Sequence, residues 1–313
     1  MCPHITRSSS SRILSLNPLL FPVLRLSLGA IAAGVLFAVL LRLRTDSDTH
    51  RRDWIRLGVL IGNGLLVVIA GSVGPWGLLP VLLFVACTGW VELVRCVEKK
   101  HGAVATPALL PILGALSLLG GLRGTVSLSV LGVLAAAWGM IALPMVITRR
   151  PPPMHGLLTA GFGALFISAP LCLLLMLVQF SYGAFAFLIF VVTVNDGFAA
   201  GFGRLMGRTQ VCPQISPGKT LEGSLGNLGV CAISGYLIRY LVPAWPVWQV
   251  ILVAAGISVL SLIGDLIASS LKREAGIKDF GNLLPVVGGV LDRFDSLLFA
   301  TPVFYVFVWG MGG

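Results

Sequence analysis

Charged residues are scarce in this chain. Only 11% of its 313 residues are Asp, Glu, Lys or Arg, whereas 57% are hydrophobic. Its mean hydropathy is +0.96. A soluble globular domain carries roughly 25% charged residues. The shortage excludes an ordinary soluble domain and predicts a protein that crosses a membrane several times.

The chain also lacks the usual patterns of metal-binding and catalytic Cys and His. Its six cysteines form no Cys-x-x-Cys pair, and no histidine follows His155. We therefore expect neither disulfides, nor a zinc site, nor a histidine general base in the C-terminal half. The net charge of +10 is expected to set membrane topology, not to bind nucleic acid.

Long apolar runs predict an all-α, polytopic integral membrane protein with about nine or ten transmembrane helices. Some runs are short or Gly-rich, so eight to ten spans are compatible with the pattern. The run 19–41 is longer than a signal-peptide core of ~7–15 residues and is expected to be the first span. The further runs are 55–72, 76–94, 104–122, 125–147, 156–178, 183–203, 224–242, 247–270 and 296–311.

Basic residues gather in alternate loops, whereas the intervening loops hold only Arg123. The basic loops cover 42–56, 95–100, 149–150, 204–219 and 272–293. The positive-inside rule places them in the cytoplasm and the N-terminus outside. The prolines at 151–153 divide the chain in two. Residues 1–150 are expected to form a transmembrane scaffold without buried acids, and 151–313 a catalytic core with cytoplasmic loops 204–223 and 271–295.

Four acids lie near the predicted cytoplasmic ends of apolar runs: Asp196, Asp265, Asp292 and Asp295. A carboxylate within a span costs at least ~2.5 kcal/mol, so such residues are functional candidates. Oxygen ligands without His or Cys favour Mg²⁺, alone or with a second cation such as K⁺.

Helical spacing groups some of these acids. Asp265 shares a face with Ser269 and Lys272, and Asp292 shares one with Asp295. Two such faces could clamp a metal between two helices. The structural alternative is an ion pair of Asp265 with Lys272 or Arg273.

The segment Ser-Pro-Gly-Lys-Thr at 216–220 precedes a helix expected to begin near Leu221. Free N–H groups at such a turn, together with Lys219, suit a phosphate. A plain helix start is equally compatible with the pattern, and the P-loop spacing is absent. Arg204 and Arg208 are either membrane anchors or phosphate ligands.

The segments SPGKTLEG and GDLIASSLKREAGIKDFGNLLPVVGGVLDRFDS closely resemble the phosphatidate cytidylyltransferase family. The family signature reads S-x-x-K-R-x4-K-D, then Pro, H-G-G and D-R-x-D. The residues in register are Ser269, Lys272, Arg273, Lys278, Asp279, Pro285, Gly288, Gly289, Asp292, Arg293 and Asp295. Asp196 with Gly203 and Arg204 resembles an upstream family segment. The departures are Val286 for Gly, Val287 for His, Ala200 for Tyr and Leu221 for Trp.

The resemblance implies transfer of CMP from CTP to phosphatidate, giving CDP-diacylglycerol and pyrophosphate, at the cytoplasmic face of the cell membrane. The implied catalytic residues are Asp265, Lys272, Arg273, Asp292 and Asp295. The implied phosphate- and substrate-binding residues are Ser216, Lys219, Thr220, Ser269, Lys278, Asp279, Arg293 and Arg204. The implied metal ligands are Asp196, Asp265, Asp292 and Asp295. The expected partners are CTP, phosphatidate or a related lipid phosphate, and the bilayer.

Several alternatives stay open at this stage. Val287 leaves room for another lipid phosphate as acceptor, or for a degenerate family member that acts as a structural partner. A cation-coupled transporter could also use buried acids, but the acids lie at one level and no inverted repeat is visible. The oligomeric state is open, with a homodimer as one alternative.

Overall fold

The computed structural model describes residues 17–22, 25, 47–104, 108–149, 153–283 and 288–311. Most of the run 19–41, predicted to be the first span, lies outside the described residues. So do Pro151 and Pro152 at the expected boundary, and Pro285, Val286 and Val287 of the family signature.

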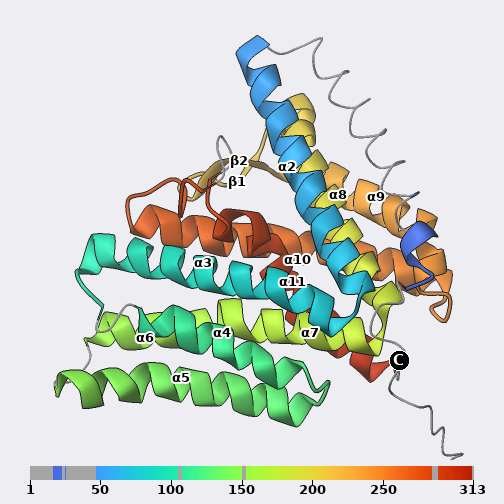
Figure 1. Ribbon diagram of the computed structural model, residues 1–313. Helices are drawn as coiled ribbons and strands as arrows, with labels where there is room; N and C mark the ends of the chain where they lie inside the picture. Colours follow the sequence, from blue (N-terminus) through green and yellow to red (C-terminus); the bar gives the residue numbers. More distant parts are fainter. Residues whose placement is uncertain are drawn as a thin grey trace, which may run out of the picture.

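The described chain is built from helices (Figure 1). They are α2 (Ser47–Ser72), α3 (Pro75–His101), α4 (Leu109–Gly121), α5 (Val126–Thr148), α6 (Met154–Gly163), α7 (Ala169–Phe180), α8 (Tyr182–Met206), α9 (Leu221–Leu237), α10 (Val247–Glu274) and α11 (Leu291–Gly310). A π-helical turn, Ala164–Ser168, joins α6 to α7, and a 3₁₀ turn, Arg239–Leu241, follows α9. Each predicted apolar run from residue 55 onward coincides with helical structure.

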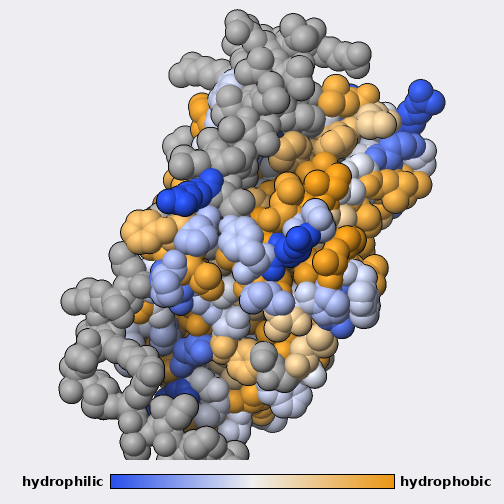
Figure 2. All heavy atoms as spheres, turned by 90° about the vertical axis from the view of Figure 1, so that its right-hand side faces the viewer, coloured by the Kyte–Doolittle hydropathy of each residue, from blue (hydrophilic) through white to orange (hydrophobic). Residues whose placement is uncertain are grey.

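The predicted integral-membrane, all-α class is confirmed. Six helices of the described residues are long and apolar enough to cross a bilayer: Trp54–Ser72, Pro75–His101, Val126–Thr148, Met154–Phe180, Tyr182–Met206 and Val247–Glu274. Large apolar side chains gather on the face shown in Figure 2. The exposed ones of α9 include Leu225, Ile233 and Leu237. Such an extensive apolar surface is expected where lipid is the solvent. The count of nine or ten spans stays a prediction.

A two-stranded hairpin interrupts the helices where the sequence predicted only a loop. Strand β1 (Gln210–Cys212) pairs antiparallel with β2 (Ser216–Thr220), with Gln210 opposite Thr220 and Cys212 opposite Ser216. Proline disfavours helical backbone in the residue before it, so Ser216, which precedes Pro217, is biased toward an extended conformation. Lys219 therefore lies in strand β2, which is followed directly by helix α9.

The core lies around α7 and α8. Most side chains of α7 are buried, and so is the first half of α8, whereas α5 buries only Ser129, Ala136, Met140 and Pro144. A helix that is apolar on every side can be packed against protein or lipid on every side. Helix α10 packs against α8, α9 and α11, α8 also packs against α9 and α11, and β2 of the hairpin contacts α8 and α9. This four-helix group positions the candidate site.

Candidate active site

Lys219 lies at the end of the hairpin and reaches α10. Its Nζ lies 2.8 Å from Asp265 Oδ2, with side chains 29% and 24% exposed. Thr220 caps α9, because its Oγ1 accepts a hydrogen bond from Gly223 N at 3.2 Å. The helix therefore begins at Leu221, as predicted, and the cap fixes the residue next to Lys219.

Three acids share the electrostatic neighbourhood of Lys219. They are Asp196 of α8, Asp265 of α10 and Asp295 of α11. Asp295 is 4% exposed, and its Oδ2 has no hydrogen-bond partner among the described residues. Lys272 also acts on Asp295 but is paired with Asp292, so Lys219 is the ammonium paired within this three-acid cluster. The cluster therefore suits an added cation.

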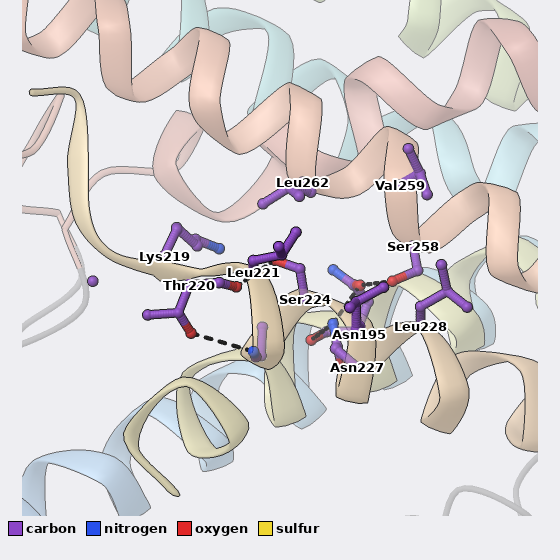
Figure 3. Close-up of a pocket in the computed structure, with 14 residues that line it drawn as sticks. Asn195, Lys219, Thr220, Leu221, Ser224, Asn227, Leu228, Ser258, Val259 and Leu262 are labelled. Atoms are coloured by element: carbon purple, nitrogen blue, oxygen red, sulfur yellow. Dashed lines mark hydrogen bonds between the residues drawn. The ribbon is translucent and has the colours of Figure 1, made fainter. Parts of the chain in front are cut away.

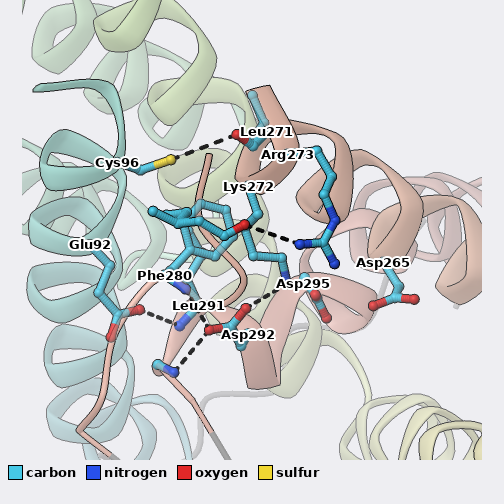
Figure 4. Close-up of polar contacts among 12 residues, drawn as sticks. Glu92, Cys96, Asp265, Leu271, Lys272, Arg273, Phe280, Leu291, Asp292 and Asp295 are labelled. Atoms are coloured by element: carbon cyan, nitrogen blue, oxygen red, sulfur yellow. Dashed lines mark hydrogen bonds and ion pairs between the residues drawn. The ribbon is translucent and has the colours of Figure 1, made fainter. Parts of the chain in front are cut away.

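Asp292 belongs to a neighbouring arrangement (Figure 4), whose Lys272 also lies in the electrostatic neighbourhood of Asp295. Its Oδ1 lies 2.6 Å from Lys272 Nζ, and the two side chains are 4% and 9% exposed. Its Oδ2 accepts hydrogen bonds from Phe280 N at 2.8 Å and Gly289 N at 2.9 Å. Both carboxylate oxygens are thus engaged by Lys272 and by the loop before α11.

That Asp292 and Asp295 share one metal-binding face stays a prediction, but the two acids have different partners. Three residues advance a helix by about 300°, so the two side chains diverge by about 60°. Asp292 pairs with Lys272 and bonds to the loop, while Asp295 lies in the electrostatic neighbourhood of Asp265, Asp196 and Lys272. Lys272 therefore pairs with Asp292, and Asp265 pairs with Lys219 and not with Lys272 or Arg273.

The residues fit a cation by their chemistry, although no group of three acids is close enough to form a coordination shell among the described residues. The unpartnered Oδ2 of Asp295 and the oxygen-only donor set suit a hard divalent ion. Asp196, Asp265 and Asp295 are the acids that could hold it. Magnesium itself stays a prediction.

A polar network that sequence reasoning missed supports Asp196. Asn195 Nδ2 donates to Asp196 Oδ1 at 3.1 Å. Its own Oδ1 accepts from Asn227 Nδ2 at 2.6 Å and from Ser258 Oγ at 2.8 Å. Two donors therefore fix the orientation of the Asn195 amide. The signal available in the sequence was an amide side chain, Asn195 or Asn227, inside an otherwise apolar run.

A cavity of about 130 Å³ adjoins this network (Figure 3). Lys219, Asn195 and Ser258 provide polar groups along its wall. Leu225 of α9 and Val259 of α10 also line it and are largely exposed at the surface. One cavity is therefore lined both by the positively charged Lys219 and by apolar residues on the surface of α9 and α10.

Arg273 and Arg293 occupy different positions. Arg273 donates to Ile215 O at 3.2 Å and Ile277 O at 3.3 Å, tying the end of α10 to the hairpin. Arg293 lines a small cavity beside Asp196, between α2, α8 and α11.

The remaining predicted residues are spread over the same end of the fold. Ser269 is buried on α10, while Lys278, Asp279 and Arg204 are exposed and Ser216 is half-buried in β2. The Asp279 carboxylate lies close to Gly288. The structure therefore brings Lys219, Asp196, Asp265 and Asp295 together and sets these residues around them.

Glu222 fastens the hairpin to α9. Its carboxylate accepts hydrogen bonds from Arg208 N at 2.9 Å and Thr209 N at 3.0 Å. These backbone N–H groups lower the pKa of Glu222 to about 2. The side chain stays ionised at neutral pH and holds the segment that leads into β1 of the hairpin.

The expectation that the N-terminal half lacks buried acids is wrong. Glu92 of α3 is 6% exposed. It accepts hydrogen bonds from Val290 N and Leu291 N at the start of α11. The sequence signal was an acid inside an otherwise apolar run, the same signal that singled out Asp196 and Asp265.

Comparison with known proteins agrees with the motifs. A family model described as "Cytidylyltransferase family" matches residues 54–311. A phosphatidate cytidylyltransferase of Brucella abortus is 36% identical over 218 residues, covering 70% of this chain and 78% of the relative. One from Staphylococcus haemolyticus is 42% identical over 123 residues, 39% of this chain and 46% of the relative. The uncharacterized protein YnbB of Escherichia coli is 40% identical over 122 residues, 39% of this chain and 41% of that protein. The match over most of the chain shows that this protein belongs to the cytidylyltransferase family.

Proposed function

We propose that the protein transfers CMP from CTP to phosphatidate, giving CDP-diacylglycerol and pyrophosphate. The observation that carries the proposal is the position of Lys219 against Asp265, beside Asp196 and Asp295. Family membership supplies the reaction class, and this cluster supplies charges that a nucleotide triphosphate and a divalent cation require.

The chemistry requires alignment more than proton transfer. A phosphatidate oxygen, already anionic, attacks the α-phosphorus of CTP and forms a new P–O bond. The bond between the α- and β-phosphates breaks, and its electron pair leaves with pyrophosphate. No general base is needed, which agrees with the absence of histidine after residue 155. The protein must overcome the repulsion between two anions and hold them in line.

The chain's own residues divide this work. Lys219 would contact a phosphate at the edge of the cavity, with Lys278 and Arg293 as further cations for the triphosphate. Asp196, Asp265 and Asp295 would hold Mg²⁺, with K⁺ as a candidate second ion. A bound divalent ion would neutralise phosphate charge. Asp292 and Lys272 keep the loop and α11 in place.

A lipid acceptor is supported by the cavity beside Lys219. Leu225 and Val259 give it an apolar wall that reaches the surface, while Lys219 gives it a cation. A lipid phosphate has the matching combination of acyl chains and an anionic head. We propose that this end of the fold faces the cytoplasm, where CTP is found, in an inner-membrane protein with nine or ten spans. A homodimer is the assembly to be tested.

The test is a direct assay of purified protein in lipid nanodiscs. CTP, Mg²⁺ and phosphatidate are supplied, and pyrophosphate and CDP-lipid are measured together, with ATP as the control nucleotide. Equimolar pyrophosphate and CDP-diacylglycerol are expected when the nucleotide is CTP, and no product is expected when it is ATP. Turnover only with a different lipid phosphate would keep the chemistry and change the acceptor. No product with any lipid phosphate would contradict an enzymatic function.

A further inference from the structure

Glu92 is a buried carboxylate of the N-terminal half that contacts the loop and helix of the candidate active site. It lies in the middle of α3 and is 6% exposed. Its Oε1 accepts a hydrogen bond from Val290 N at 2.9 Å, and its Oε2 accepts one from Leu291 N at 2.7 Å. Figure 4 shows the side chain reaching from α3 to the beginning of α11.

The contact acts as a helix cap supplied from another helix. The first N–H groups of any helix lack partners within it. Val290, the N-cap residue of α11, provides no side-chain cap. Glu92 accepts from two of these groups, and its negative charge is favourable at the positive end of a helix. Burial disfavours the charge of Glu92, and two charge-assisted hydrogen bonds oppose that penalty.

The loop backbone also packs directly against Glu92. A Cβ atom added at Gly281 would lie 2.5 Å from Glu92 Oε1, and one added at Gly289 would lie 2.6 Å from it. Both positions therefore exclude any side chain while Glu92 stays where it is. The two described ends of the loop meet at this one carboxylate.

The same turn of chain carries acids of the site. Gly289 N donates to Asp292, which in turn holds Lys272. One turn further along α11, Asp295 lies beside Asp265. A displacement of the first turn of α11 would therefore shift Asp292 and Asp295 together, relative to α10.

We propose that Glu92 is a positioning residue for cytidylyl transfer, which sets the first turn of α11 so that Asp295 stands opposite Asp265. The proposal rests on the proposed function. Glu92 touches neither substrate nor reacting atoms, and it acts through the backbone of Val290 and Leu291. Its removal should lower the rate of the bound complex more than the affinity for CTP.

The principal variant is Glu92→Gln, with Glu98→Gln as matched control. Gln keeps the shape of Glu but offers one accepting oxygen, so its amino group meets a backbone N–H that it cannot accept. Glu98 lies on the same helix and accepts a hydrogen bond from Val104 N at 3.1 Å, away from the site. For Glu92→Gln, kcat per folded molecule is expected to fall about 10- to 100-fold, as for misplaced reacting groups. KM for CTP should change by less than about threefold, and Glu98→Gln should keep wild-type kinetics.

A second measurement reports the contact without relying on turnover. Hydrogen–deuterium exchange of peptides covering 288–296 should be faster in Glu92→Gln than in wild type, and unchanged in Glu98→Gln. If the wild type makes no CDP-lipid, the proposed function fails while the exchange measurement still decides the contact. Unchanged exchange in Glu92→Gln would overturn the proposal at that point.

Two further variants separate position from charge and from folding. Glu92→Asp keeps the charge but is one methylene shorter, so it should be as slow as Glu92→Gln. Recovery of kcat in Glu92→Asp would overturn the positioning role in favour of charge alone. If Glu92→Gln does not accumulate, Gly289→Ala disturbs the same contact from the loop side and should give the same fall in kcat. Wild-type kcat in either Glu92→Gln or Gly289→Ala would also overturn the proposal.

Discussion

The two lysine–aspartate pairs at this end of the molecule differ in their surroundings. Lys272 and Asp292 are almost fully buried, and the loop backbone occupies the second oxygen of Asp292. Lys219 and Asp265 are about a quarter exposed, and Lys219 borders a cavity. Two further acids, Asp196 and Asp295, adjoin the second pair. Each oxygen of the Asp292 carboxylate already has a hydrogen-bonding partner, whereas the surroundings of the Lys219–Asp265 pair are more acidic.

Similar residue pairs thus take different roles according to their surroundings. A buried, fully bonded pair fixes the geometry of a loop, because breaking it leaves a charge without a partner. In a partly exposed pair with further carboxylates nearby, the acid can bind a metal cation and the lysine can bind a phosphate in place of each other. We therefore assign binding and chemistry to the Lys219–Asp265 region and loop positioning to the Lys272–Asp292 pair.

The largest expected effect on activity follows Asp265→Asn. The substitution removes one charge from the three-acid cluster and should lower kcat at least ~10²-fold, as loss of a charge-stabilising group does. The partly exposed site should tolerate the amide, so membrane insertion and melting temperature should stay near wild type. Steady-state turnover and thermal unfolding in the same detergent check both statements. Retained activity would show that Asp265 has no role in the reaction.

Asp292→Asn should instead act through stability. Lys272 is left buried without its counter-ion, a loss of about 3–5 kcal/mol for a buried pair. The melting temperature should fall clearly, with activity falling in parallel because the loop loosens. The double variant Lys272→Met with Asp292→Asn should regain part of the lost stability. A melting temperature equal to that of Asp265→Asn would erase the distinction between the two pairs.

A smaller effect is expected from two serines of α10. Ser258 donates to Asn195 at 2.8 Å, whereas buried Ser261 Oγ has no hydrogen-bond partner among the described residues. Loss of one hydrogen bond of about 1 kcal/mol corresponds to roughly fivefold, so Ser258→Ala should lower kcat/KM by about that factor. Ser261→Ala is the control and should match wild type. Equal effects of the two substitutions would mean that the Asn195 network does not support Asp196.

The smallest effect concerns the hairpin that carries Lys219. The pKa of Glu222 is lowered to about 2 in the folded protein. Its stabilising effect is therefore fully present above its ordinary pKa near 4.5 and is lost as pH falls through about 2. Glu222→Gln should melt slightly below wild type at a constant difference from pH 8 to pH 5. Thermal scans at decreasing pH should show that difference shrinking, and a difference that grows toward acid pH would contradict this role.

Sequence patterns predicted much of this arrangement, because membrane helices are marked by long apolar runs. The helical segments from residue 55 onward, the helix start at Leu221 and the approach of Asp196, Asp265 and Asp295 all follow from such patterns. The hairpin at 210–220 was missed because its strands are only a few residues long. Spacing alone also could not show that Asp292 and Asp295 turn to different partners.

Glu92 is the clearest example of a contact that the sequence alone could not predict. Its partners are backbone N–H groups about two hundred residues away in the chain, and backbone groups leave no mark in the sequence. The contact exists only because α3 packs against the start of α11 in the tertiary structure. A buried acid in an apolar run is a visible signal, but its partner is not.

The most direct measurement compares turnover of the wild type and Asp265→Asn in the same nanodiscs, with CTP, Mg²⁺ and phosphatidate. We expect the wild type to form CDP-diacylglycerol and pyrophosphate in equal amounts. The variant, folded and inserted to the same extent, should form almost none. Equal product from both proteins would contradict the assignment of chemistry to the Lys219–Asp265 region. Product from neither, with phosphatidate or any other lipid phosphate, would contradict cytidylyl transfer itself.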